Sequence, residues 1–262
     1  MNFILNLASS FAVQMIATLG ILFLFGKVIA FCNTRFYRNF GSKGHAVCIA
    51  TGFIGTPIHE AAHALMCVVF RHKITEIKFF QPNSSDGTLG YVNHSYNPKS
   101  LYQRIGNFFI GIAPILVGSL ILSGLLYFLL PEMVEEMLSQ LEKVDFVSDF
   151  GSALFYIGKA VTTMFGYILT WQFWVFLLAG SFIALHMTLS RADVQGALSG
   201  VLLVAVVFLV VDGILLVIKK SLLASFTNVI LICGTFLLFF CCLFFLLAVV
   251  LLILSTMIAK RL

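Results

Sequence analysis

Long apolar runs are the feature that most constrains how this chain can fold. A helix needs about 20 apolar residues to cross a hydrocarbon core of about 30 Å. Hydrophobic residues make up 60% of the chain, whereas charged residues make up 10%, against about 25% in soluble domains. We therefore predict an all-α, multi-pass integral membrane protein, with residues 1–262 forming one membrane domain of about six spans. The predicted spans are approximately residues 11–31, 45–70, 105–130, 166–189, 196–218 and 226–258.

Charge and cysteine content limit the expected partners. We expect the chain to contact the lipid bilayer and a membrane-protein or peptide substrate. The net charge of +5 comes from dispersed Lys and Arg, with no basic run, so nucleic acid is not an expected partner. The first apolar run lacks a charged leading segment and is too long for a signal peptide, so we expect it to be retained. In a six-span arrangement each side carries eight Lys and Arg, and the positive-inside rule selects no orientation. The six cysteines show no metal-binding or redox spacing and are expected to act as small apolar side chains.

A His-Glu-Ala-Ala-His motif occupies residues 59–63, inside the second apolar run. On a helix, His59 and His63 lie one turn apart on one face, so both imidazoles can reach the same metal ion. Glu60 is not needed as a ligand and is placed to take a proton from a metal-bound water. The alternative is a chance match, but three ionisable groups in five residues are costly beside lipid unless they have a function. The motif predicts a catalytic zinc site, although other divalent metals accept similar ligands.

Glycine and proline residues just upstream of the motif predict a break in its helix. Gly52, Gly55 and Pro57 interrupt the apolar run. We expect Thr56 to cap, and Pro57 to open, a fresh helix that carries the motif. Pro114 is expected to kink the third span without ending it.

The segment 72–98 predicts a β-hairpin after the motif. Residues 74–80 form an imperfectly alternating strand, residues 82–87 form a turn, and residues 90–96 form a returning strand. A surface loop without a task is the alternative. An exposed strand edge beside a peptidase site would hold an extended substrate by strand addition, and the candidate residues for this are Gly90, Tyr91, Val92 and Asn93.

Acidic residues are concentrated in residues 131–150, with Met, Val and Leu at helical intervals between them. This pattern predicts an amphipathic helix at the membrane interface, and its charges are expected to form a solvated face. The apolar residues that follow, up to about residue 165, are expected to lie on the membrane surface or to enter it partially.

A catalytic zinc usually has three protein ligands, so one ligand must lie outside the motif. Asp193 ranks first, although Ser190 and Asp193 also form a capping box at a predicted helix start. His186 ranks second as a ligand, and the alternatives are a group that orients a ligand, a group that shuttles protons, or merely a hydrogen-bonded histidine of the helix bundle. Asp212 ranks third because it is an intramembrane carboxylate.

These features together resemble a known family, the site-2-protease class of intramembrane zinc peptidases. The resemblance rests on His59 to His63, the strand pair, and the run Gly111-Ile112-Ala113-Pro114, and it covers about residues 45–125. It implies that the two histidines bind zinc, that Glu60 is the general base, and that a later aspartate, Asp193 or Asp212, completes the site. The family's Asn-x-x-Pro-x-x-x-Asp-Gly pattern does not occur as such, and neither does an inserted peptide-binding domain.

The sequence thus predicts an intramembrane zinc metalloendopeptidase that cleaves membrane-anchored or membrane-adjacent protein segments. The leading alternative is a transporter or metal-binding membrane protein without hydrolytic activity, in which intramembrane His and Asp line a cation path. A third reading is an inactive scaffold that binds membrane helices. The substrate, the scission position and the oligomeric state are not specified by the sequence.

Overall fold

The chain is mostly helical, as predicted, with one small antiparallel sheet. The computed structural model describes residues 2–85, 87–145 and 149–260. Its elements are α1 (Asn2–Met15), η1 (Ile16–Gly20), α2 (Ile21–Asn39), η2 (Gly41–Lys43), α3 (Gly44–Val69), β1 (Lys73–Lys78), β2 (Tyr91–Ser95), α4 (Leu101–Leu129), α5 (Pro131–Leu141), α6 (Phe150–Thr162), η3 (Thr163–Tyr167), α7 (Trp171–His186), α8 (Arg191–Ile218) and α9 (Lys220–Ala259).

Contacts divide these elements into two compact units that alternate along the chain. The first unit contains Met1–Phe25, Ser123–Phe176 and Ala205–Phe244. The second contains Gly26–Leu122, Leu177–Val204 and Phe245–Leu262. The motif and the hairpin both belong to the second unit, so the candidate site can be described within it.

Four helices of the described chain, rather than six, are long and apolar enough to cross a membrane. They are the continuous run Phe3–Asn39, α4, α8 and α9. The predicted second span is the helix α3, whose apolar character is reduced by the polar motif, and it is not among the four. The predicted fourth span is shorter than expected, because a 3₁₀ segment and a turn occupy residues 163–170 before α7 begins. Since α7 has 16 residues, it is about 24 Å long, less than the hydrocarbon core of about 30 Å.

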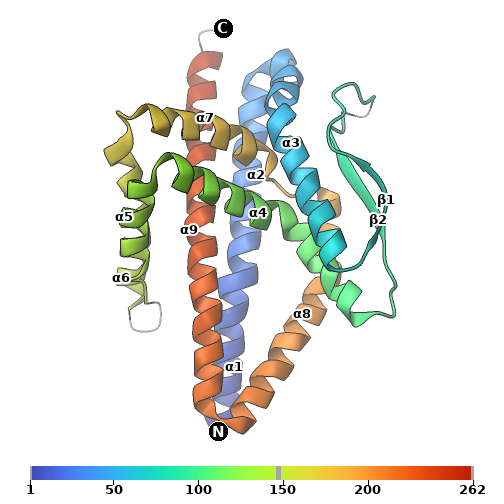
Figure 1. Cartoon of the computed structure of the whole chain (residues 1–262), viewed down its shortest axis with the longest axis vertical. Coiled ribbons are helices and arrows are strands. Elements are labelled where there is room, and N and C mark those ends of the chain that lie inside the picture. The colour runs from blue at the N-terminus through green and yellow to red at the C-terminus, as the bar shows by residue number, and fades with distance from the viewer. Residues whose placement is uncertain (1, 86, 146–148, 261–262) are drawn as a thin grey trace. The chain divides into compact units, whose positions relative to one another are not determined.

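The hairpin is confirmed, and it packs against α3 (Figure 1). Strands β1 and β2 pair antiparallel, with Lys73 opposite Ser95 and Lys78 opposite Tyr91. The register shifts between Ile74 and Glu76, which is the irregularity expected of a strand with imperfect alternation. The connecting loop closes through a hydrogen bond from the Gln81 amide to the Leu89 carbonyl, 2.7 Å long.

The predicted break in the motif helix is wrong, because α3 runs without interruption through Pro57. The two glycines upstream serve close packing instead of a turn. A side chain at Gly55 would collide with the Phe182 carbonyl and the His186 ring, and one at Gly52 would lie 3.2 Å from that ring. Gly52 and Gly55 thus lie where the end of α7 approaches α3.

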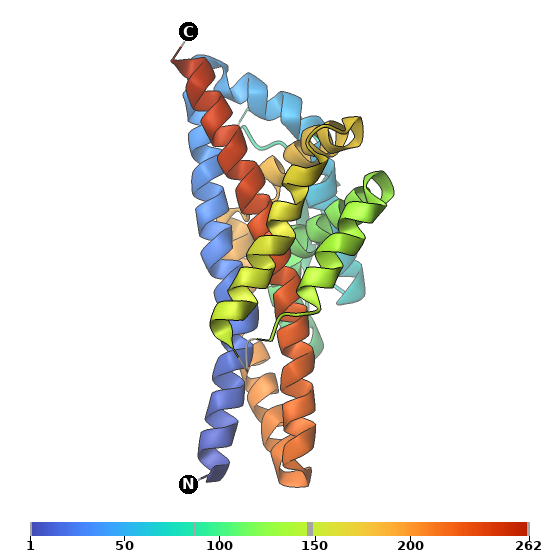
Figure 2. The ribbon, with the colours of Figure 1, turned by 90° about the vertical axis from the view of Figure 1, so that its left-hand side faces the viewer.

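The acidic segment forms a helix, but a shorter one than the predicted 131–150. Helix α5 ends at Leu141, and it buries Met133, Met137 and Leu141, which are spaced at four-residue intervals. It packs beside α6 in the first unit (Figure 2). Asp149 caps α6, since its Oδ1 accepts hydrogen bonds from the amides of Gly151 and Ser152.

A polar cluster is buried among the helices of the first unit. Gln14 and Asp212 are both fully buried, with relative exposures of 0%. The Gln14 amide donates to Asp212 Oδ1 and to Thr227 Oγ1, each at 3.0 Å. Asp212 is thus held by an interhelical hydrogen bond in the unit that does not contain the motif.

Loss of the Asp212 carboxylate should destabilise the first unit. In Asp212→Ala the buried Gln14 amide loses one of its two acceptors, at a cost of about 1–3 kcal/mol. Asp212→Asn keeps a side-chain oxygen at this place and should unfold close to the native temperature. Thermal unfolding of the detergent-solubilised variants measures the difference. Equal melting temperatures for the native chain and Asp212→Ala would contradict a stabilising role.

Candidate metal centre

Three side chains that could hold a metal ion meet in the second unit: His59 and His63 from α3 and Asp193 from the first turn of α8. One potential ligand atom from each lies within 4.8 Å of the other two. The Nε2 atoms of the two histidines are 3.0 Å apart, Asp193 Oδ1 lies 3.2 Å from His63 Nε2, and Asp193 Oδ2 lies 3.6 Å from His59 Nε2. Tetrahedral zinc with bonds of about 2.0–2.2 Å places its ligands about 3.3–3.6 Å apart, so the two carboxylate distances are close to that range and the distance between the imidazoles is shorter.

Backbone carbonyls fix the orientation of both imidazole rings. His59 Nδ1 lies 2.6 Å from the His186 carbonyl, and His63 Nδ1 lies 2.7 Å from the Ile110 carbonyl. A carbonyl only accepts, so each Nδ1 carries the proton and each neutral ring has a lone pair on Nε2. Two lone pairs and a carboxylate therefore face one another. A shared cation satisfies this arrangement.

A proline explains why the Ile110 carbonyl is available. In an α-helix the amide of residue 114 would donate to the carbonyl of residue 110. Residue 114 is Pro, which has no N–H, so the Ile110 carbonyl has no such partner within α4. His63 donates to it instead. The predicted kink residue thus has a specific effect, because it frees an acceptor for a candidate ligand.

The other carbonyl is available because α7 ends there. The last four carbonyls of a helix have no partner within it. The His186 carbonyl accepts from His59, and the Asn33 amide donates to the carbonyls of Ala184 and Leu185, at 3.1 and 3.2 Å. Asn33, on α2, therefore holds the helix end that orients His59.

The ring of His186 lies outside the group of three candidate ligands. Its Nε2 is 3.0 Å from Thr51 Oγ1 and 3.2 Å from the Tyr37 hydroxyl, and its Nδ1 is 3.3 Å from Thr56 Oγ1. These contacts fix the end of α7 against α3. The backbone carbonyl of His186, rather than its ring, contacts His59, whereas the ring is hydrogen-bonded to Thr51, Tyr37 and Thr56.

Asp193 lies beside both motif histidines and also forms the predicted capping box. Its Oδ2 accepts a hydrogen bond from the Ser190 amide at 2.7 Å, and its own amide donates to Ser190 Oγ at 3.1 Å. This is a capping box, and it leaves Oδ1 toward His63. Gly111 allows the approach, since any side chain there would collide with the Asp193 carbonyl and with Ala197. Asp212 belongs to the other unit and is not part of the group of candidate ligands.

A cavity of about 500 Å³ opens beside the three candidate ligands. Glu60 lines it and is buried, with a relative exposure of 6%. The predicted substrate-binding residues of the hairpin line it as well, namely Gly90, Tyr91, Val92 and Asn93. A side chain at Gly90 would collide with Glu60 and Thr56, so this glycine lets the hairpin approach the motif. The cavity thus brings a carboxylate, a potential metal centre and a strand together.

Sequence reasoning missed the groups that hold the candidate ligands in place. Asn33, Tyr37 and Thr51 are polar residues in or beside apolar helices, a signal that could have identified them. The Ile110 carbonyl was also missed, and the signal for it is a proline four residues later.

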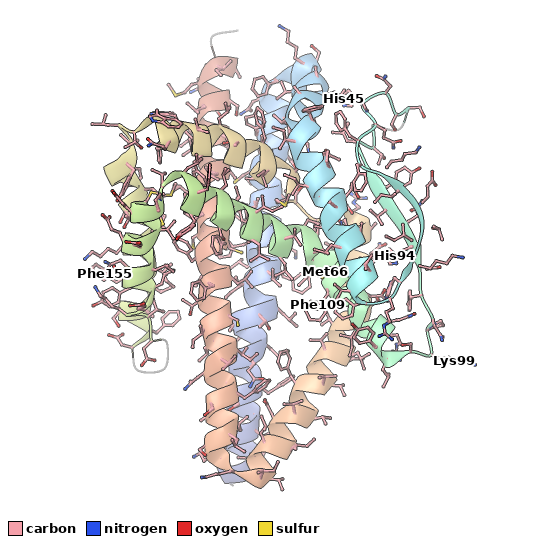
Figure 3. The ribbon with its side chains drawn as sticks, viewed as in Figure 1. His45, Met66, His94, Lys99, Phe109 and Phe155 are labelled. Atoms are coloured by element: carbon pink, nitrogen blue, oxygen red, sulfur yellow. The ribbon has the colours of Figure 1, made fainter. Side chains whose placement is uncertain are left out.

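A histidine pair joins the hairpin to α4 at the edge of the cavity. His72 Nε2 donates to the Gln103 carbonyl at 2.8 Å, so its Nδ1 accepts from His94 Nδ1, 3.0 Å away. His94 extends from the hairpin (Figure 3) and lines the cavity. Burial first, and then the nearby His72 and His63, hold the pKa of His94 below its usual range. His94 is therefore neutral at pH 7.

Replacing Pro114 with alanine should weaken metal binding. The new amide at position 114 would donate to the Ile110 carbonyl and compete with His63 for it. We expect zinc affinity to fall by about tenfold, the lower end of what loss of such an orienting group costs. Titration against a fluorescent chelator measures this, and Pro131→Ala, at the start of α5, is the matched control. Unchanged affinity in Pro114→Ala would contradict this role of the Ile110 carbonyl.

Acid should remove the stability that neutral His94 provides. Its pKa is lowered in the fold, so the unfolded chain binds more protons below pH 6.5, the ordinary histidine value. Stability linked to His94 is therefore complete above pH 6.5 and declines as the pH falls through that value. The melting temperature of the native chain minus that of His94→Gln should shrink between pH 7.5 and 5.5. The same comparison with exposed His45→Gln is the control, and a constant difference for His94→Gln would refute the effect.

Comparison with protein-family models, with curated proteins and with solved structures finds no match to this chain. The chemistry of the cavity and its three candidate ligands is therefore the basis on which a function can be inferred.

Proposed function

We propose that this chain is an integral membrane zinc metalloendopeptidase. The observation that carries the proposal is the convergence of His59, His63 and Asp193, with both imidazoles held by carbonyls so that Nε2 faces the carboxylate. Two His and one carboxylate are a ligand set of catalytic zinc sites, which keep a further position open for water. Four helices long and apolar enough to cross a membrane support the membrane location.

The proposed reaction is hydrolysis of a peptide bond. The chemistry that a zinc ion supplies in such a site is Lewis acidity toward water and a carbonyl oxygen. Glu60 takes a proton from the attacking water as the water oxygen bonds to the carbonyl carbon. Glu60 then gives this proton to the leaving nitrogen as the C–N bond breaks, which yields an amine and a carboxylic acid that keeps the second proton of the water. Its place in the cavity, next to His59 in the chain, suits this transfer.

The proposed substrate is a membrane-anchored or membrane-adjacent protein segment that unwinds locally. A peptide bond inside a helix is shielded by the helix's own hydrogen bonds, so the substrate must be extended before attack. The strand from Gly90 to Asn93 offers an edge on which an extended segment could pair, and all four residues line the cavity. Pairing there would hold the segment beside Glu60.

Zinc content and turnover together test the proposal. Native protein purified in detergent should hold about one zinc per chain, as one such site implies. His59→Ala and Asp193→Ala should lose it, whereas Asp212→Ala should retain it. Glu60→Gln should keep zinc and cleave synthetic membrane-spanning peptides in liposomes about 10²–10⁴-fold more slowly, with products identified by mass spectrometry.

Two results would overturn the proposal. One is native protein that binds no zinc even after reconstitution, and the other is a Glu60→Gln variant that cleaves as fast as the native chain. A chain that binds zinc and cleaves nothing would instead favour a metal-binding membrane protein without hydrolytic activity.

A further inference from the structure

A buried amide faces the cavity and has no role in the reaction as described so far. Asn107 lies on α4 and lines the cavity together with Ile110 and Gly111 from the same helix. Its relative exposure is 6%. Ile110, whose carbonyl holds His63, follows it by three positions, which corresponds to about 4.5 Å along the helix axis.

No residue that the structure describes forms a hydrogen bond with the side chain of Asn107. Gln103, one turn earlier on the same helix, has hydrogen-bond partners for both atoms of its side-chain amide. The Gln103 amide donates to the Arg71 carbonyl at 2.8 Å, and Gln103 Oε1 accepts from the Asn97 amide at 2.6 Å. The amide of Asn107, which lines the cavity, is therefore available to a molecule that enters it.

Three titratable groups of the cavity offer acceptors. His94 uses its Nδ1 proton in the bond to His72, so its other ring nitrogen is an acceptor. Glu60 and Asp193 are acceptors when ionised. The amide of Asn107 carries two N–H donors, and a peptide carbonyl needs a donor. Asn93 and Arg191 also line the cavity and carry donors, but both are exposed, whereas Asn107 is buried.

We propose that the side-chain amide of Asn107 donates a hydrogen bond to the carbonyl oxygen of the peptide bond to be cleaved. This inference rests on the proposed peptidase function and assigns a substrate contact within it. As the water oxygen bonds to the carbonyl carbon, negative charge grows on that oxygen. A donor placed at this oxygen stabilises the growing negative charge more than it stabilises the neutral carbonyl. Asn107 is then a catalytic residue, because it touches the reacting group.

Two inhibitors of one peptide sequence separate this role from a structural one. A peptide hydroxamate presents a carbonyl oxygen at the metal, whereas a peptide thiol binds through sulfur and has no such oxygen. Asn107→Asp keeps the size of the side chain and removes its donors, and Asn107→Leu removes them without adding charge. Asn228→Leu, at an exposed position on α9, is the matched control. Zinc content and inhibitor binding are measured on zinc-loaded, detergent-purified protein.

We expect both Asn107 variants to keep zinc and to bind the hydroxamate at least about tenfold more weakly, while thiol binding changes less than about twofold. Loss of one such donor lowers kcat by about 10²–10³-fold in comparable sites, with a smaller effect on KM. Native hydroxamate affinity in zinc-loaded Asn107→Leu would overturn the proposal and leave the peptidase function standing. Equal weakening of both inhibitors would also overturn it, because a structural role predicts that result. A native chain without zinc would refute both proposals together.

Discussion

The candidate site depends on two backbone carbonyls that lack partners in their own helices. One belongs to Ile110 and lacks its partner because residue 114 is a proline, and the other belongs to His186 at the end of α7. Each accepts the Nδ1 proton of one motif histidine, which leaves Nε2 as the free ligand atom of the ring. The sequence motif identifies His59 and His63 as two possible ligands. The end of α7 and the proline in α4 set the orientation of their rings. The same two contacts join α3 to α4 and to α7.

Packing around α3 follows from small residues at the points where backbones approach. Gly55 admits the end of α7, Gly90 admits the hairpin, and Gly111 admits the start of α8. At each place a side chain would collide with backbone or with a residue of the site. Glycine is needed at these points because α7, the hairpin and α8 all approach α3 or α4 around the candidate metal centre. The hydrogen bonds between these elements require short distances between backbones.

Local patterns predicted the parts of the molecule that depend on local structure. The spacing of His59 and His63, the turn-rich segment between the strands and the Ser190 to Asp193 capping box are such patterns, and each appears at its expected place. Six spans are not confirmed, because apolar composition alone reveals neither the 3₁₀ segment and turn before α7 nor the effect of the polar motif on α3. Helix α3 continues through Pro57, and the choice between Asp193 and Asp212 depends on which helices meet. These outcomes depend on contacts between residues far apart in the chain.

The capping box at Asp193 also affects how a metal would be received. Its carboxylate is held by the Ser190 amide, and the Asp193 amide in turn holds Ser190 Oγ. A free carboxylate side chain loses rotational freedom when it first binds an ion, and that loss weakens the affinity. Here helix initiation has already restricted the rotamer. The start of α8 would therefore preorganise Asp193 for a metal ion. The side chain of this third candidate ligand loses its rotational entropy when the protein folds, rather than when an ion binds.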